Sequence, residues 1–502
     1  SKLSKNQVGK LAEALTNPIL EEYFINESPD FRSFPFVKAG QAYAIEISFL
    51  PGVTDNVGHT VKEIATDLLH LEKSSDFYAY TSKIFLIKAK NLKDAKQTAL
   101  NLYNPLIERS YITLVKAGKI KLPNKIPEVV LKKSVPVKSV SLSVSDEELI
   151  KIGKEGILDE DGARRGTLAL DLSSMKAIKA YFAKLKRNPM DIELESLAQT
   201  WSEHCKHTIF ANPIDDIKDG LYKTYIKGAT NLIRKQKGKK DFCVSVFKDN
   251  SGGIIFDKDY LITHKVETHN SPSALDPFGG AITGIGGVNR DTIGFGLGAK
   301  PIANTYGFCF GQPDDKRKLF KNKDKNGKLT QLMLPPKRIM DGVIKGINAG
   351  GNCSGIPTLS GFVKFDDRYR GKPLVFAGTI GLIPRNLPIS GKNGKRLSHE
   401  KSAKAGDYIV MVGGRVGLDG IHGATFSSVA LDSTSPATAV QIGDPITQKK
   451  LSDAIVKEAR DMDLYNSITD NGAGGLSCSV AEMAKECGGA KVYLDKVPLK
   501  YP

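Results

Sequence analysis

The chain has 502 residues, of which 40% are hydrophobic and 25% charged, and its formal net charge is +17 at pH 7. This composition is ordinary for a globular protein, and the length predicts three or four domains. No run of 18 or more apolar residues occurs and the N-terminal segment lacks a secretory signal core, so we expect neither a membrane span nor export.

The lysine clusters and the six cysteines indicate which kinds of binding site to expect. The lysine clusters at 234–240 and 316–328 are not interleaved with stacking aromatic residues, since Phe320 is the one aromatic residue in them, and this favours solvated surface loops over the alternative of a nucleic-acid site. No two cysteines form a CxxC pair, so we expect no disulfide framework and no common zinc site. A reducing cytoplasm fits this pattern best.

Residues 1–115 alternate strand and helix signals, which predicts a ferredoxin-like domain. Residues 116–210 are predicted to be a linker and a helical domain, with helices at 145–156 and 175–185 and a third one capped by Asn188. The strands expected in the first domain lie at 19–25, 43–50 and 83–89, and its helices at 11–16, 61–71 and 92–104.

The remaining sequence predicts two lobes. Residues 211–390 combine strands with glycine-rich turns, and residues 391–502 read as an α/β block. In the second lobe we expect strands at 405–414 and 467–470 and helices at 448–464 and 476–486.

Three side chains that can bind ligands or transfer protons lie together at the end of an apolar strand. Lys265, Glu267 and His269 alternate, so their side chains should share one face. Lysine supplies a phosphate contact, glutamate a hard oxygen ligand for Mg²⁺, and histidine a proton exchanger near neutral pH. The alternative is an exposed polar strand end that binds nothing.

A glycine-rich segment, 279–298, follows and is predicted to be a loop. Backbone N–H groups approach an anion closely where no side chain intervenes, although the spacing matches neither Walker A nor the dinucleotide pattern. Arg290 could fork onto a phosphate and Asp291 could bind a second metal; a surface ion pair is the alternative. The glycines singled out for the cofactor are Gly279, Gly280, Gly284, Gly286 and Gly287.

Two further segments fit a metal–phosphate site. Asp470 precedes a run of glycines that opens a predicted helix, and helix N-termini favour anions. Gln441 offers an amide contact, although the Asp444–Pro445 pair beside it is also a plain turn.

Taken together, these motifs resemble phosphoribosylformylglycinamidine synthase of the large, single-chain type. The resemblance rests on six segments in the family's order: RNPMDIELESLAQTWSEHCKHTIF, KVETHNSPSALDPFGGAITGIGGVNRD, GGNCSGIPTLSGFVKFDDRY, GLDGIHGATFSS, AVQIGDP and TDNGAGGLS. It implies an N-terminal domain like the family's small companion subunit, then a helical linker and one aminoimidazole-ribonucleotide-synthetase-like module. That module has a β-barrel-forming lobe and an α/β lobe, at 211–390 and 391–502.

The resemblance also implies roles and ligands. The implied reaction converts formylglycinamide ribonucleotide to formylglycinamidine ribonucleotide through an iminophosphate, with ATP, Mg²⁺ and ammonia from glutamine, in purine biosynthesis. His204 and His269 would be catalytic, the latter as proton acceptor, and Lys265 would contact ATP. Substrate contacts would come from Thr268, Asn270, Ser271, Arg290 and Gln441, and metal ligands from Glu267, Asp291 and Asp470.

Two departures from the family pattern bear on these roles. Many members have a second histidine where this chain has Ser271, and the family's second synthase module and glutaminase domain are not in this sequence. We therefore expect the chain to need a second module, and its edge strands to be exposed without one. The alternatives are another ATP-dependent synthetase or kinase of the same superfamily and a nucleotide-binding structural module.

Overall fold

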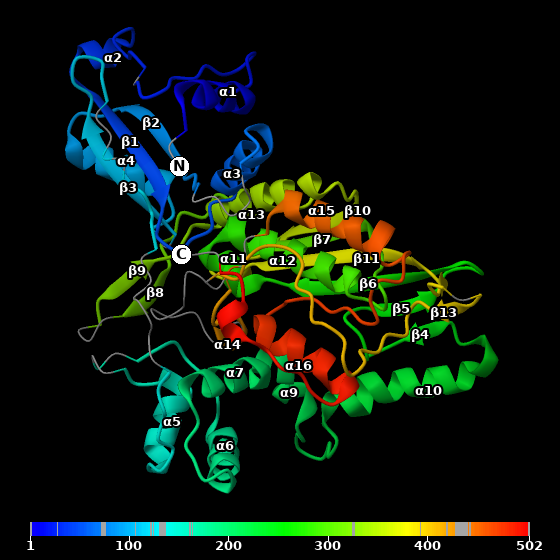
Figure 1. Cartoon of the computed structure of the whole chain (residues 1–502). Helices are drawn as coiled ribbons and strands as arrows, with labels where there is room; N and C mark the ends of the chain where they lie inside the picture. Colours follow the sequence, from blue (N-terminus) through cyan, green and yellow to red (C-terminus); the bar gives the residue numbers. More distant parts are fainter. Residues whose placement is uncertain are drawn as a thin grey trace. The chain divides into compact units, whose positions relative to one another are not determined.

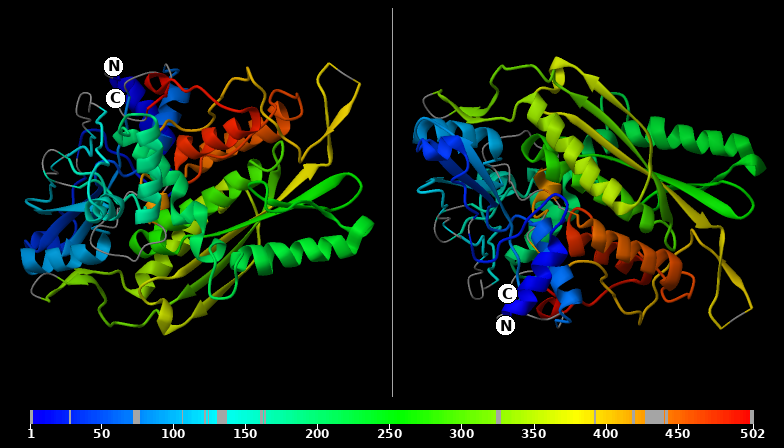
Figure 2. Two further views of the ribbon diagram at one scale, coloured as in Figure 1. Left: turned by 90° about the horizontal axis from the view of Figure 1, so that it is seen from below. Right: turned by 90° about the horizontal axis from the view of Figure 1, so that it is seen from above.

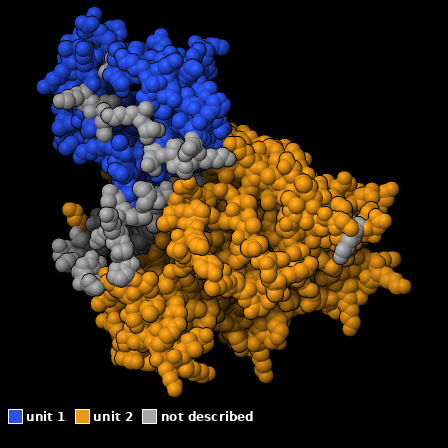
Figure 3. Space-filling model, in the orientation of Figure 1, with its two compact units in different colours: residues 1–131 blue, residues 132–502 orange. Residues whose placement is uncertain are grey.

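A computed structural model describes most of the chain, and the described part divides into two compact units (Figure 3). Unit 1 is residues 1–131 and unit 2 is residues 132–502. The described residues are 3–27, 29–71, 77–105, 107–120, 123, 125–129, 137–159, 162, 164–323, 327–391, 393–417, 420–426, 440 and 443–499.

Unit 1 is built on a three-stranded antiparallel sheet in the order β2-β1-β3. The central strand β1 is covered on both sides: Ala42 and Ala44 join one apolar cluster, while Ile45 and Ile47 join another. The elements of the unit are α1 (Lys5–Leu15), α2 (Pro35–Lys38), β1 (Ala42–Phe49), α3 (Asn56–Leu68), β2 (Ser82–Lys88), α4 (Leu92–Leu102) and β3 (Glu108–Leu114).

The strand predicted at 19–25 is wrong. Asn17 begins a turn instead, because its side chain accepts the Ile19 N–H at 3.1 Å and its carbonyl accepts the Glu21 N–H at 2.8 Å. Ile19 is 88% exposed, and no described strand pairs with this segment. β3, which the sequence reading did not identify, completes the sheet.

Unit 2 begins with helices packed around a shared apolar core. They are α5 (Asp146–Glu155), α6 (Leu172–Lys184) and α7 (Asp191–Trp201), and the short helices α8 (Glu203–Lys206) and α9 (Thr208–Ala211) follow them. Ser145 caps α5 as predicted, with its side chain accepting the Glu148 N–H. The predicted cap at Asn188 is wrong: α7 begins at Asp191, where Glu193 folds back onto the Met190 N–H at 2.8 Å.

The first lobe is organised by a six-stranded sheet in the order β10-β7-β11-β6-β5-β4, with only β10 and β7 parallel (Figure 1). The strands are β4 (Cys243–Ser245), β5 (Gly252–Ile255), β6 (Tyr260–Thr268), β7 (Lys300–Phe310), β10 (Thr358–Phe365) and β11 (Leu374–Pro384). Two hairpins lie outside it: β8 (Phe320–Lys323) with β9 (Leu329–Leu332), and β12 (Asn386–Pro388) with β13 (Lys395–Leu397).

The helices of this lobe are α10 (Gly228–Lys237), α11 (Asn270–Leu275), α12 (Pro277–Ile293) and α13 (Pro336–Gly350), with a π-helical segment at Tyr222–Lys227. Short 3₁₀ turns lie at Gly238–Lys240, Asn352–Ser354 and Asp367–Tyr369. α12 and α13 pack side by side on one face of the sheet, and their apolar residues share a core with β7 and β11 (Figure 2).

The glycine-rich loop predicted at 279–298 is wrong for most of its length, because Pro277–Ile293 is the helix α12. Asp276 caps it by accepting the Gly279 N–H at 3.0 Å, and Pro277 occupies its first turn. The glycines serve close packing: a Cβ on Gly280 would lie 2.5 Å from the Ser273 nitrogen. Tertiary contact therefore outweighs the low helix propensity of glycine here.

The opposite face of the sheet carries exposed apolar side chains. Val266 is 44% exposed, Phe362 47%, Tyr260 39% and Ile254 37%. Phe362 lies over Gly307, and a hollow of about 370 Å³ is lined by Ile254, Ile262, His264 and Ile380 among others.

The second lobe contains helices but, within its described residues, no strand. The helices are α14 (Gly423–Phe426), α15 (Pro445–Asp453), a π-helical continuation at Ala454–Ala459, α16 (Gly475–Cys487) and a 3₁₀ turn at Leu494–Lys496. The strands predicted at 405–414 and 467–470 are therefore wrong: neither segment belongs to a sheet, and Tyr408 is 94% exposed. The helices predicted at 448–464 and 476–486 are confirmed in position.

No helix among the described residues combines the length and the apolar character needed to cross a bilayer.

Candidate functional site

Strand β6 delivers the first two site residues. Leu261 and Thr263, further back on the strand, are buried, and Lys265 and Glu267 continue the same side of the strand. The Lys265 Nζ lies 3.0 Å from Glu267 Oε1 and 3.3 Å from Asp291 Oδ2. The predicted shared face is confirmed for Lys265 and Glu267, whereas His269 lies just beyond the end of the strand.

Helix α12 delivers Arg290 and Asp291, and the residue before them fixes the helix on the sheet. The buried Asn289 Oδ1 accepts the Asn304 amide at 3.1 Å and the Thr379 hydroxyl at 2.7 Å. Because Asn289 is anchored on the sheet in this way, the helix presents Asp291 to Lys265.

The second lobe contributes Asp470, which lies beside these residues although it is distant in sequence. Its Oδ2 is 3.5 Å from Arg290 Nε, and its Oδ1 accepts the Asn250 side-chain amide at 3.0 Å. The same amide lies 3.4 Å from Asp291 Oδ1. The candidate site is therefore assembled from both lobes.

The carboxylates of the site lie close together, and this shifts the pKa values of Asp291 and Lys265. Burial and, after it, the neighbouring Asp470 together raise the pKa of Asp291 to about 7, against the opposing effect of Lys265. For Lys265, burial lowers the pKa, but Asp291 and Glu267 outweigh it and the pKa is raised overall. Lys265 thus stays charged between two acidic side chains.

His269 occupies the turn between β6 and α11. Burial lowers its pKa to about 4, with Glu267 acting in the opposite direction and His204 and Arg290 adding to the decrease. The imidazole is therefore neutral at pH 7 and can accept a proton. His204, on α8, comes close enough to influence it, so the structure brings the two predicted catalytic histidines together.

Helix α11 holds the predicted substrate residues. The His269 N–H donates to the Val375 carbonyl and the Asn270 Oδ1 accepts the Val375 N–H, both at 2.9 Å, which ties the start of α11 to β11. Thr268 is exposed at the end of β6, while Ser271 is 2% exposed and its hydroxyl has no hydrogen-bond partner among the described residues.

The glycines of α12 differ in what surrounds them. Gly279 and Gly280 are packed against Asp276 and Ser273, whereas a Cβ on Gly284 would lie 3.2 Å from the His269 ring. Gly287 has open space beside it, and a Cβ on Gly286 would meet only the Arg290 side chain. Gln441 lies outside the described residues.

The donor set fits a divalent cation. Glu267, Asp291 and Asp470 offer the carboxylate oxygens that Mg²⁺ prefers, and the Asn250 amide nitrogen donates to the last two of them. Burial first, and then repulsion from Asp470, raise the pKa of Asp291, and a bound cation would relieve the repulsion. Lys265 and Arg290 add the positive charge that a phosphate group needs.

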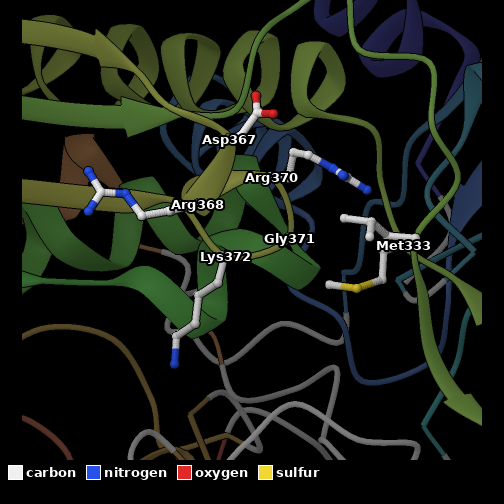
Figure 4. Close-up of a pocket in the computed structure, with 7 residues that line it drawn as sticks. Met333, Asp367, Arg368, Arg370, Gly371 and Lys372 are labelled. Atoms are coloured by element: carbon white, nitrogen blue, oxygen red, sulfur yellow. The ribbon is translucent and has the colours of Figure 1, made fainter.

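A separate hollow of about 560 Å³ lies beside the hairpin β8–β9 (Figure 4). It is lined by Leu319, Met333, Asp367, Arg368, Arg370, Gly371 and Lys372. Its arginines are largely neutralised: Arg370 pairs with Asp315 at 3.0 Å and Arg368 with Asp366 at 2.8 Å. We therefore give this hollow no part in the site.

Sequence reasoning missed two residues that the site depends on. Asn250 bridges Asp291 and Asp470, and Lys401 binds the segments on which they lie. A signal existed for Asn250, because the sequence Asp249-Asn250-Ser251 followed by two glycines is typical of a turn, whereas Lys401 stands in a lysine-rich stretch that carries no such signal.

Three family models match unit 2. Residues 160–207 match the formylglycinamide ribonucleotide amidotransferase linker domain. Residues 248–383 match the N-terminal domain of AIR synthase related proteins, and residues 404–502 match their C-terminal domain.

Curated relatives share one name. The phosphoribosylformylglycinamidine synthase subunit PurL of Thermoplasma volcanium is 37% identical over 361 residues, which are 71% of this chain and 41% of the relative. The PurL subunit of Granulibacter bethesdensis is 34% identical over 62% of this chain and 37% of the relative. The chain thus spans about two fifths of the length of these relatives.

Among solved structures, Thermotoga maritima PurL complexed with FGAR is 28% identical, with a TM-score of 0.48, over 65% of this chain and 44% of that one. The same protein complexed with ATP matches with a TM-score of 0.43 at 26% identity, over 65% and 43% of the two chains.

Proposed function

The chain belongs to the phosphoribosylformylglycinamidine synthase family, and from this premise we propose that it carries out the synthase step of purine biosynthesis. The proposed reaction converts formylglycinamide ribonucleotide, ATP and ammonia to formylglycinamidine ribonucleotide, ADP and phosphate. Glutamine, through a glutaminase partner, is the proposed ammonia source.

The observation that carries the proposal is the cross-lobe cluster. Lys265 and Glu267 on β6, Asp291 on α12 and Asp470 from the second lobe form one network of contacts beside the neutral His269. Such a cluster provides metal ligands, a cation for phosphate and a proton acceptor, which are the groups that transfer of a phosphoryl group followed by amination needs.

The proposed roles follow the chemistry of each side chain. Lys265 holds the ATP phosphates and Arg290 the substrate phosphate, while Glu267, Asp291 and Asp470 hold Mg²⁺. Bound Mg²⁺ would offset negative charge on the transferring phosphoryl group. Thr268, Asn270, Ser271 and Gln441 contact the substrate, and the open side of α12 at Gly286 and Gly287 admits it or the nucleotide closely.

The reaction proceeds in two balanced steps. The amide oxygen of the substrate bonds to the γ-phosphorus of ATP as the bond to ADP breaks. Ammonia then bonds to the amide carbon, the carbon–oxygen bond breaks and phosphate leaves. His269, neutral because burial lowers its pKa to about 4, accepts the proton that ammonia loses, and His204 on α8 is close enough to lower that pKa further.

The domain layout is part of the proposal. Residues 1–115 form a ferredoxin-like domain like the family's small companion subunit, 116–210 the linker and helical domain, and 211–390 and 391–502 the two lobes. The order β2-β1-β3, with helices after β1 and β2, supports the first assignment because it is the order of three of the four strands in a ferredoxin-like sheet. We place the protein in the cytoplasm.

The open face of the first-lobe sheet is the proposed contact for a second synthase module. Val266, Phe362 and Tyr260 expose apolar surface there, on the side of the sheet away from α12. A contiguous apolar face on a sheet is costly in water and is a common docking surface. The second module would close the two sheets into a barrel.

We expect the isolated chain to self-associate through this face. Size-exclusion chromatography with light scattering should give a dimer or larger species, and Phe362→Lys should shift it toward monomer. Ile344→Lys, an equally exposed apolar position on α13, is the control and should leave the mass unchanged. A stable and active wild-type monomer at all concentrations would contradict the pairing.

The reaction itself is tested with formylglycinamide ribonucleotide, MgATP and ammonium chloride, with phosphate release and amidine product as readouts. We expect turnover by the wild type and a loss of about 100-fold or more in His269→Ala, the size of a general-base contribution. His70→Ala, at an exposed histidine of unit 1, is the matched control and should keep full activity.

The same preparation distinguishes the structural alternative. ADP binding by isothermal titration without turnover, alone or with a glutaminase and a second module added, would favour a nucleotide-binding module over an enzyme. Turnover with another phosphate acceptor, but none with this substrate, would instead point to a different synthetase or kinase of the superfamily.

A further inference from the structure

Lys401, between the two lobes, has its ammonium group fully occupied by three acceptors. Its Nζ lies 2.6 Å from Asp249 Oδ1, and it donates to the Gly294 carbonyl at 2.7 Å and to the Ile468 carbonyl at 2.8 Å. The side chain is only 14% exposed, and that of Asp249 only 7%. An ammonium group has three hydrogens, so each of them has a partner.

The three acceptors all lie next to residues of the candidate cation site. Asp249 precedes Asn250, Gly294 lies three residues after Asp291, and Ile468 lies two residues before Asp470. These segments come from a turn of the first lobe, from the end of α12 and from the second lobe. One ammonium group therefore joins the three pieces of chain that supply the site.

Asp249 extends the connection. Its Oδ2 accepts the Gly296 N–H and its Oδ1 accepts the Asn250 N–H, both at 2.8 Å. The residue after Lys401 strengthens the contact with the second lobe, because the Ser402 N–H donates to the Asn466 carbonyl at 3.2 Å. Lys401 and Asp249 thus form a buried ion pair whose hydrogen bonds connect the chain segments that carry Asn250, Asp291 and Asp470.

We propose that Lys401 is a positioning residue for divalent-cation binding, which sets the distance between Asp291 on the first lobe and Asp470 on the second. The inference rests on the proposed cation site. Lys401 touches neither substrate nor cation; it acts by holding backbone carbonyls. Outer residues that orient metal ligands typically change affinity by about 10- to 100-fold when they are removed.

The test measures Mn²⁺ binding to the full chain from the electron paramagnetic resonance signal of the free ion. We expect the wild type to bind Mn²⁺ and Lys401→Met to bind it at least about tenfold more weakly. Lys457→Met is the matched control in the same lobe, because Lys457 pairs with Asp453 on the surface, and its affinity should equal that of the wild type.

Removing Lys401 alone leaves the buried Asp249 charge without its partner, which can destabilise the fold. The double variant Lys401→Met with Asp249→Asn removes that charge but leaves the Gly294 and Ile468 carbonyls without their donor. We expect it to fold, as judged by thermal unfolding and near-ultraviolet circular dichroism, and to keep the weakened Mn²⁺ affinity.

The outcomes separate the two proposals. Absence of Mn²⁺ binding by the wild type overturns the cation site itself. Wild-type binding together with unchanged affinity in Lys401→Met, or full recovery in the double variant, overturns the positioning role only, because Lys401 would then merely neutralise Asp249.

Discussion

The two lobes of unit 2 respond differently to similar sequence patterns. In the first lobe, apolar segments such as Tyr260–Thr268 pair with neighbours and bury a core that includes Phe295 and Ile285. In the second lobe, segment 405–414 also carries an apolar run but pairs with no strand, and Tyr408 is 94% and Val410 76% exposed. A strand is stable only when another strand accepts its hydrogen bonds.

This difference teaches how the site is built. Lys265, Glu267 and Asp291 are held by the packed sheet and by α12, whereas Asp470 comes from a segment of the second lobe that belongs to no sheet. The position of Asp470 therefore depends on the few side chains that cross between the lobes, such as Asn250 and Lys401.

The largest expected effect contrasts two aromatic residues. Phe295→Ala, at a fully buried position of the first lobe, should lower the free energy of unfolding by roughly 3–5 kcal/mol. Tyr408→Ala, in the second lobe, should change it by less than about 0.5 kcal/mol. Urea unfolding followed by circular dichroism measures both. Similar losses for the two would mean that segment 405–414 is packed in solution.

The joint between the helical domain and the second lobe should respond to pH. Burial raises the pKa of Glu195 on α7 to about 7; Arg165 lowers it and Asp191 raises it. Its Oε2 lies 3.9 Å from Nδ1 of His422, whose pKa burial lowers, just before α14. Glu195 is thus protonated in the folded state below pH 7. Above pH 7 its buried carboxylate is charged, which lowers the free energy of unfolding.

Glu195→Gln should therefore be more stable than the wild type at pH 8, by up to roughly 3 kcal/mol, since one pKa unit corresponds to about 1.4 kcal/mol. The difference should shrink as the pH falls from 7 toward about 4.5, where Glu195 is protonated in both states. Urea unfolding across this pH range checks the trend; a difference independent of pH would contradict it.

A smaller effect tests how tightly α12 is packed. Gly280→Ala should destabilise the protein by roughly 1–3 kcal/mol, because the new Cβ would lie 2.5 Å from the Ser273 backbone nitrogen. Gly287→Ala, in the same helix but beside open space, should stabilise it by up to about 1 kcal/mol. If neither substitution changed the free energy of unfolding, the close packing of α12 would be contradicted, because the helix would have to shift freely on the sheet.

How far prediction from sequence succeeded depended on the range of the interactions. Local signals were sufficient for α5, where Ser145 caps the helix, and for β6, where alternation placed Lys265 and Glu267 on one face. They failed for α12, because glycines that favour a loop in isolation are required where α11, α12 and α13 approach closely. They failed again at 405–414, where pairing rather than composition decides.

The sequence by itself determined which chemical groups are present and to which family the chain belongs. It could do so because motif residues such as Lys265, Glu267 and His269 lie within a few positions of one another. Only the tertiary structure decided that Asp470 meets Arg290 across 180 residues, that Asn250 bridges the carboxylates and that Lys401 holds their segments together. These contacts join chain segments that no local pattern relates, since they form only when both lobes have packed.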